Sequence, residues 1–172
     1  PVENEYMYDR LIRSNLQNDS FELMFQPQFK ASTHELRGFE ALLRMKDDYG
    51  RYVSADKFIP YAGKSKLIFD IDRWVLNNAM KLIKPYYILS RSDFILSINI
   101  SALHLQNESL FDDIARSLKM HEFPSKNLEI EITETSLVSS VANATMLLNK
   151  IKKLGIKVAL DELYAASVEG KT

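Results

Sequence analysis

The fold of this chain is decided by a short apolar stretch, Gly38-Phe39-Glu40-Ala41-Leu42-Leu43-Arg44, at the centre of a predicted β-strand, Leu36 to Met45. An earlier strand is predicted over Phe21 to Phe29, where apolar residues alternate, and Pro27 should halt it because proline donates no ladder hydrogen bond. Residues 30–35 between the two strands are polar and few. The shortest connection is therefore a hairpin that pairs these strands antiparallel.

Helices and strands alternate along the rest of the sequence. Apolar spacing predicts helices over Glu5–Leu16, Ser54–Ile59, Asp70–Tyr86, Leu110–Met120 and Ser136–Leu154, and strands over Phe94–Ile100, Leu128–Ile132 and Ile156–Leu160. Strands separated by helices long enough to cross over imply parallel neighbours. The pattern predicts one α/β domain over residues 1–172, with five strands.

Composition excludes several classes of protein. The 172 residues are 46% hydrophobic and 26% charged, which is typical of a folded domain, and the net charge of -1 argues against a binder of nucleic-acid polymers or of anionic membranes. The absence of cysteine excludes disulfides and thiolate zinc sites and is compatible with a reducing compartment. No apolar run reaches the ~20 residues of a membrane helix. We therefore expect a soluble, cytoplasmic domain without membrane contact.

Four oxygen-bearing side chains lie within or at the end of predicted strands: Glu40, Asn99, Glu131 and Asp161. In α/β folds, ligands bind beyond the carboxyl ends of the strands. A set of carboxylates and an amide, without sulfur or imidazole, suits a hard cation such as Mg²⁺ or Mn²⁺. Each acid alone is more often a solvated or capping residue, and Asn99 could satisfy loop backbone, but the four together favour a metal site.

The stretch 38–44 resembles the signature of EAL-domain cyclic di-GMP phosphodiesterases. Further matches to that family follow in order: Phe25-Gln26-Pro27, Val53-Ser54, Phe58-Ile59-Pro60, Trp74-Val75-Leu76, Ile98-Asn99-Ile100-Ser101, Leu128 to Glu134 and Val158 to Asp161. The resemblance covers residues 21–161, and the tail 162–172 diverges. It implies a TIM-like (β/α) barrel of EAL type whose first strand is antiparallel.

The resemblance also implies an activity and a set of site residues. The family hydrolyses cyclic di-GMP with Mg²⁺ or Mn²⁺. Carried over residue by residue, the metal ligands are Glu40, Asn99, Glu131 and Asp161, the dinucleotide contacts are Gln26, Leu43 and Arg44, and the residue that supports a loop is Glu134. Two alternatives stay open: Arg44 could form a surface ion pair, and Glu134 could be an acid at a helix N-terminus.

The match ends after Asp161. The family continues Asp-Phe-Gly, whereas this chain continues Glu162-Leu163-Tyr164, so Glu162 keeps a carboxylate on a side chain one methylene longer. A later lysine and the general-base glutamate of the family have no counterpart, and we assign no catalytic residue. We expect a chain that is deficient in hydrolysis and keeps metal or dinucleotide binding or a protein-interaction role. The alternative is an active phosphodiesterase that accepts Glu162 as a further metal ligand and whose missing groups come from another chain or from sequence absent here.

Five strands cannot close a barrel, because a TIM barrel needs eight. The predicted strand over 156–160 would expose an open edge, which favours a homodimer or another protein partner. A stable monomeric mass by light scattering at micromolar concentration would contradict this expectation.

The remaining candidates are weaker. His34, His104 and His121 lack metal-like spacing and are expected at surface or helix positions. Ser101 and His104 are three residues apart, but we find no acid to orient them. The aromatic residues Trp74, Tyr86 and Tyr87 are expected in the core.

Overall fold

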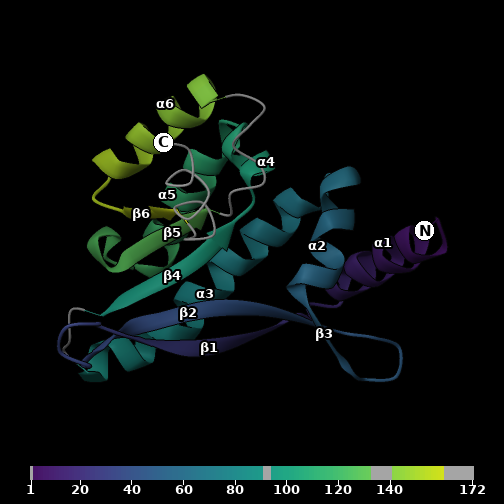
Figure 1. Cartoon of the computed structure of the whole chain (residues 1–172), viewed down its shortest axis with the longest axis horizontal. Helices are drawn as coiled ribbons and strands as arrows, with labels where there is room; N and C mark the ends of the chain where they lie inside the picture. Colours follow the sequence, from purple (N-terminus) through teal and green to yellow (C-terminus); the bar gives the residue numbers. More distant parts are fainter. Residues whose placement is uncertain (1, 91–93, 133–140, 161–172) are drawn as a thin grey trace, which may run out of the picture.

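A single mixed sheet organises the chain, for which the computed structural model describes residues 2–90, 94–132 and 141–160. Its strands follow the order β1-β2-β4-β5-β6, and β3 pairs with β2 outside this path (Figure 1). Their bounds are β1 Glu22–Phe29, β2 Leu36–Lys46, β3 Tyr52–Ser54, β4 Ile95–Ile100, β5 Leu128–Ile132 and β6 Lys157–Leu160. The predicted antiparallel pairing of β1 with β2 is confirmed, and β2, β4, β5 and β6 are parallel neighbours. The predicted count of five strands was wrong, because β3 is a sixth.

Helices cover the sheet and connect its parallel strands. They are α1 Val2–Gln17, α2 Ala55–Lys64, α3 Ile68–Ser90, α4 Ala102–Leu105, α5 Ser109–His121 and α6 Val141–Lys153, with a short 3-10 helix over Ser125–Asn127. The core lies between the helices and one face of the sheet, where Leu96, Ile98 and Ile130 are fully buried. Hydrophobic burial on this face holds the parallel strands in register.

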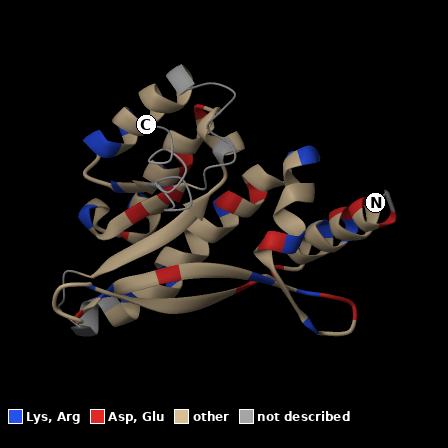
Figure 2. Cartoon of the chain, viewed as in Figure 1, with Lys and Arg blue, Asp and Glu red and all other residues tan. Residues whose placement is uncertain are grey.

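The opposite face of the sheet carries polar residues, because side chains alternate along a strand. Ser97 of β4 pairs in register with Glu40 of β2 and with Glu129 of β5, and Asn99 pairs with Glu131. We call this surface the inner face. Figure 2 shows acidic residues within the otherwise largely uncharged strands. The strand register therefore collects Glu40, Asn99 and Glu131 on one face.

Several local predictions were wrong for identifiable reasons. Pro27 does not halt β1, which continues to Phe29, because β1 lies at the edge of the sheet order, where proline is tolerated. Helix α2 passes through Pro60 to Lys64, beyond the predicted end at Ile59. Tyr86 is 65% exposed on α3 and is not a core residue, whereas Trp74 is partly buried against the core.

No helix within residues 2–90, 94–132 and 141–160 is long and apolar enough to cross a membrane. The expected homodimer or other protein partner at the open edge of the sheet stays a prediction.

Candidate functional site

Three of the four predicted metal ligands lie together on the inner face. Asn99 Nδ2 donates a hydrogen bond of 2.7 Å to Glu40 Oε1, and Asn99 is the register partner of Glu131 on the next strand. Asp161 and Glu162 lie outside the described residues, as does the loop-supporting candidate Glu134. Within the described ranges no three His, Asp or Glu side chains form a metal-binding group. The predicted ligands that lie in these ranges are two carboxylates and one amide.

The charges of this set fit a divalent cation. Burial raises the pKa of Glu131, and the negative charge of Glu40 raises it further, while hydrogen bonds from Gln28 and Ser97 act in the opposite direction. Two carboxylates that repel one another in a partly buried place are stabilised when a cation is added. Oxygen ligands of this kind are those that Mg²⁺ and Mn²⁺ prefer.

We expect Glu131→Gln to raise the melting temperature of the metal-free chain at pH 7. Because the folded-state pKa of Glu131 is raised, its ionised form costs stability above that pKa, and the cost disappears as the pH falls through it. Solvent screening of this half-buried group limits the gain in unfolding free energy to less than about 1 kcal/mol. A full 1 kcal/mol would raise the melting temperature by about 2–4 °C.

Calorimetry from pH 7 downward checks this expectation, and the difference between variant and parent should shrink toward acid pH. Glu122→Gln is the matched control, because Glu122 is 84% exposed and its ion pair with Lys84 lies at the surface, so this variant should not raise the melting temperature. A melting temperature lowered by Glu131→Gln would contradict the repulsion between the two carboxylates.

A cavity of about 620 Å³ reaches Asn99, one of the predicted metal ligands. It lies between β2, α2, α3 and the end of β4, and its walls are mostly apolar, formed by residues that include Leu42, Leu43, Ile59, Ile71 and Val75. Polar side chains at the cavity are those of Arg44, Asp56, Asp72, Asn99 and Ser101. A cavity of this size, with apolar walls and a few polar groups, is typical of a small-molecule site.

The three predicted dinucleotide contacts have different surroundings. Arg44 lines the cavity and donates to the carbonyl of Leu43 at 2.8 Å, and no carboxylate among the described residues pairs with it. The alternative of a surface ion pair therefore has no support in the described part of the chain. Leu43 is largely buried and also lines the cavity. Gln26 is exposed on β1, beside Glu40 in register and outside the cavity lining.

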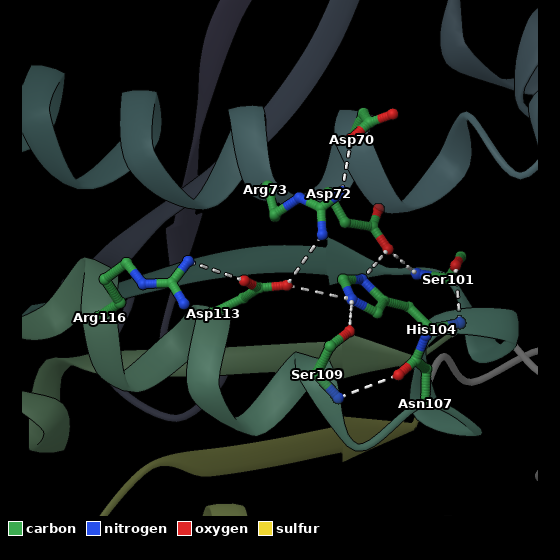
Figure 3. Close-up of polar contacts among 9 residues, drawn as sticks. All are labelled: Asp70, Asp72, Arg73, Ser101, His104, Asn107, Ser109, Asp113 and Arg116. Atoms are coloured by element: carbon green, nitrogen blue, oxygen red, sulfur yellow. Dashed lines mark hydrogen bonds and ion pairs between the residues drawn. The ribbon is translucent and has the colours of Figure 1, made fainter.

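A buried polar network lies behind the cavity and corrects one prediction. His104, in α4, is fully buried, and its Nδ1 lies 3.0 Å from Asp72 Oδ2 on α3 (Figure 3). The backbone N–H of Ser101 donates to the same carboxylate oxygen at 3.3 Å, and His104 Nε2 lies 3.5 Å from Asp113 Oδ2 on α5. An acid that orients His104 therefore exists. The sequence signal was Asp72 itself, which lies four residues after Ile68 on the buried face of a helix.

A second polar group, absent from the sequence predictions, lies on the inner face next to Glu131. We call Gln28, Arg37, Ser97 and Glu129 the inner cluster. Arg37 binds Glu129 through two hydrogen bonds of 3.0 and 2.6 Å. Burial alone would raise the pKa of Glu129, but hydrogen bonds from Arg37 and Ser97 outweigh it and lower that pKa. The available signal was that Glu129 alternates with Glu131 and so shares its face of β5.

Comparison with known proteins agrees with this arrangement. The family model described as "EAL domain" matches residues 9–168. The signaling protein YkoW of Bacillus subtilis is 30% identical over 154 residues, which are 90% of this chain and 19% of that protein. The cyclic di-GMP phosphodiesterase NbdA of Pseudomonas aeruginosa is 26% identical over 158 residues, covering 92% of this chain and 20% of that protein. This chain therefore spans about a fifth of the length of such relatives.

The solved structure of the PaMucR phosphodiesterase in complex with cyclic di-GMP superposes with a TM-score of 0.84 at 25% identity. The match covers 91% of this chain and 64% of that one. The six-stranded sheet is accordingly part of a TIM-like barrel, with its first strand antiparallel. With a family model that matches almost its whole length, the chain belongs to the EAL-domain family.

Proposed function

We propose that this chain binds cyclic di-GMP together with Mg²⁺ or Mn²⁺ and that the 172 residues alone do not hydrolyse it. The observation that carries the proposal is the position of Arg44, which lines the same cavity as Asn99 and has no carboxylate partner among the described residues. A guanidinium without a carboxylate partner suits a phosphate diester, and apolar walls suit the faces of purine bases. Relatives named as cyclic di-GMP phosphodiesterases support this choice of ligand.

Glu40, Asn99 and Glu131 would hold the cation, and we add Asp161 on the strength of the family resemblance. When bound, such a cation polarises a phosphoryl oxygen and activates water. This chain's own residues position the ligand: Arg44 neutralises phosphate charge, and the cavity excludes water from the bases.

The proposal of binding without turnover depends on the sequence after Asp161. Glu162 stands where the family has a second aspartate, and the 172 residues contain no counterpart of the family's later lysine and base glutamate. A competent phosphodiesterase would need these groups from another chain or from additional sequence. That is the second candidate function.

Calorimetric titration with cyclic di-GMP in the presence of Mn²⁺ tests the binding. We expect Arg44→Ala to weaken binding by about 10–100-fold, because a hydrogen bond to a charged group contributes about 1.5–3 kcal/mol. Arg51→Ala is the matched control, since Arg51 is 72% exposed and lies outside the cavity lining. Equal affinities for Arg44→Ala and the parent chain would contradict the assignment of Arg44 to the phosphate.

Chromatography of the same mixtures tests turnover. We expect cyclic di-GMP to persist unchanged with Mg²⁺ or Mn²⁺. Linear dinucleotide that forms with the parent chain and not with Glu40→Ala would replace the proposal with the active phosphodiesterase.

A further inference from the structure

Gln28 joins the two polar groups of the inner face, the inner cluster and the predicted metal ligands. Its Nε2 donates to Glu131 Oε1 at 3.3 Å, and its Oε1 accepts from Arg37 Nη1 at 3.2 Å. Ser97 Oγ lies 3.2 Å from the same Gln28 oxygen and 3.0 Å from Glu129 Oε1, and it also hydrogen-bonds Glu131, so its one hydrogen serves one of these acceptors at a time. The side chain of Gln28 thus connects three residues, one each on β2, β4 and β5.

The neighbours of Gln28 fix the orientation of its amide. Arg37 can only donate hydrogen bonds, so the amide oxygen must face it. An ionised carboxylate can only accept, so the amide nitrogen must face Glu131. A serine or threonine hydroxyl is too short to reach both Arg37 and Glu131. A carboxylate at this position would place a second negative charge beside Glu131. An amide on a two-methylene side chain meets both requirements.

The β-bulge in the first hairpin explains how Arg37 comes to this place. Gln28 is opposite Gly38 and Phe29 is opposite Leu36, so Arg37 is an extra residue on β2 where the register shifts. Such an extra residue re-aims a side chain. Arg37 then reaches Glu129, which is 8% exposed, and the bidentate pair satisfies both charges.

This pairing matters for Glu131, because a cation competes with any nearby positive charge. Arg37 is neutralised by Glu129, and Gln28 stands between Arg37 and Glu131 with hydrogen bonds to both. Glu131 therefore receives a neutral donor in place of a guanidinium. Its Oε1 is held in position by a neutral donor, and no cation among its described hydrogen-bond partners neutralises the carboxylate.

We infer that Gln28 is a positioning residue that orients the Glu131 carboxylate toward a divalent cation. The inference rests on the proposed function, since it assumes that Glu131 binds the cation. Partners that hydrogen-bond to metal ligands typically change metal affinity 10–100-fold when they are removed.

Titration of the chain with Mn²⁺, followed by electron paramagnetic resonance of the free ion, tests the inference without substrate. We expect Gln28→Met, which keeps the side-chain length and removes the donor, to weaken Mn²⁺ binding by about 10–100-fold. Gln28→Asn keeps the amide on a shorter side chain, and we expect a loss in the same direction. Gln17→Met repeats the substitution at an exposed position at the end of α1 and should bind Mn²⁺ like the parent.

The outcomes separate the two proposals. If Gln28 merely supported the fold, its variants would lower the metal-free melting temperature and leave Mn²⁺ affinity unchanged. Equal Mn²⁺ affinity for the parent, Gln28→Met and Gln28→Asn overturns the inference alone. Absence of Mn²⁺ binding by the parent chain overturns the proposed function and this inference with it.

Discussion

Replacement of Gly38 with alanine should destabilise the chain by about 3 kcal/mol or more, as expected for overpacking where no rotamer change can relieve it. A Cβ atom at this position would lie 1.8 Å from the carbonyl oxygen of Ile95 and 2.6 Å from its nitrogen. Both are backbone atoms of β4, so no side chain can turn away. The two strands would have to separate at the register pair Gly38 and Ile95.

The separation of β2 from β4 would also displace two of the predicted metal ligands, Glu40 and Asn99. Glu40 lies two residues beyond Gly38 on β2, and the 2.7 Å hydrogen bond from Asn99 to Glu40 crosses the same strand pair. We therefore expect loss of stability and of Mn²⁺ binding together. Urea unfolding monitored by circular dichroism, with the Mn²⁺ titration, measures both.

Gly63→Ala is the matched control for this prediction. Gly63 lies in α2, and an added Cβ would meet no atom within 4 Å. Since alanine is favoured over glycine in a helix by about 1 kcal/mol, this variant should be as stable as the parent or more so. If Gly38→Ala and Gly63→Ala both had the parent's urea midpoint of unfolding, that result would contradict the close approach of β2 and β4 at Gly38.

The sequence was sufficient where the structure depends on local pattern. The antiparallel pairing of β1 and β2 follows from two apolar strands and the short polar connection over 30–35. The gathering of Glu40, Asn99 and Glu131 follows from their positions on parallel strands. These predictions needed only periodicity and the rule that parallel strands end at one edge.

The rest depends on contacts between residues far apart in sequence. The pairing of His104 with Asp72 spans 32 residues, and that of Arg37 with Glu129 spans 92. Neither is encoded in a local period, and the second also needs the bulge at Gln28 and Phe29. The elements β3 and α4, of three and four residues, are too short to show a periodic signal.

Asp72→Ala should be the most destabilising substitution in the buried network, at about 2–6 kcal/mol, because it leaves two donors without their acceptor at about 1–3 kcal/mol each. Asp72 is 4% exposed and His104 is fully buried. Burial raises the pKa of Asp72, and the hydrogen bond with His104 acts against that rise. Without the carboxylate, the buried His104 Nδ1 and the partly buried backbone N–H of Ser101 lose their acceptor.

No other acceptor among the described residues around His104 can replace Asp72 at the Nδ1 side of the ring. Its other nitrogen, Nε2, lies 3.4 Å from Ser109 Oγ and 3.5 Å from Asp113 Oδ2 (Figure 3). Asp113 also pairs with Arg73 and Arg116, so its charge is already shared among cations. The loss of Asp72 therefore leaves Nδ1 without a partner among these residues.

Chemical unfolding of three variants distinguishes a buried pair from an incidental contact. Glu35→Ala breaks an exposed ion pair with Lys30 and should cost less than about 1 kcal/mol. The double variant Asp72→Leu with His104→Phe replaces both polar partners with apolar groups and keeps a ring near Phe69, whose ring centroid lies 5.0 Å from that of His104. It should recover part of the stability lost in Asp72→Ala, because it leaves no imidazole N–H without an acceptor, whereas the backbone N–H of Ser101 still lacks the Asp72 oxygen. A cost below about 1 kcal/mol for Asp72→Ala would show that water or another acceptor replaces the carboxylate, and that the link from α3 to the end of β4 does not depend on it.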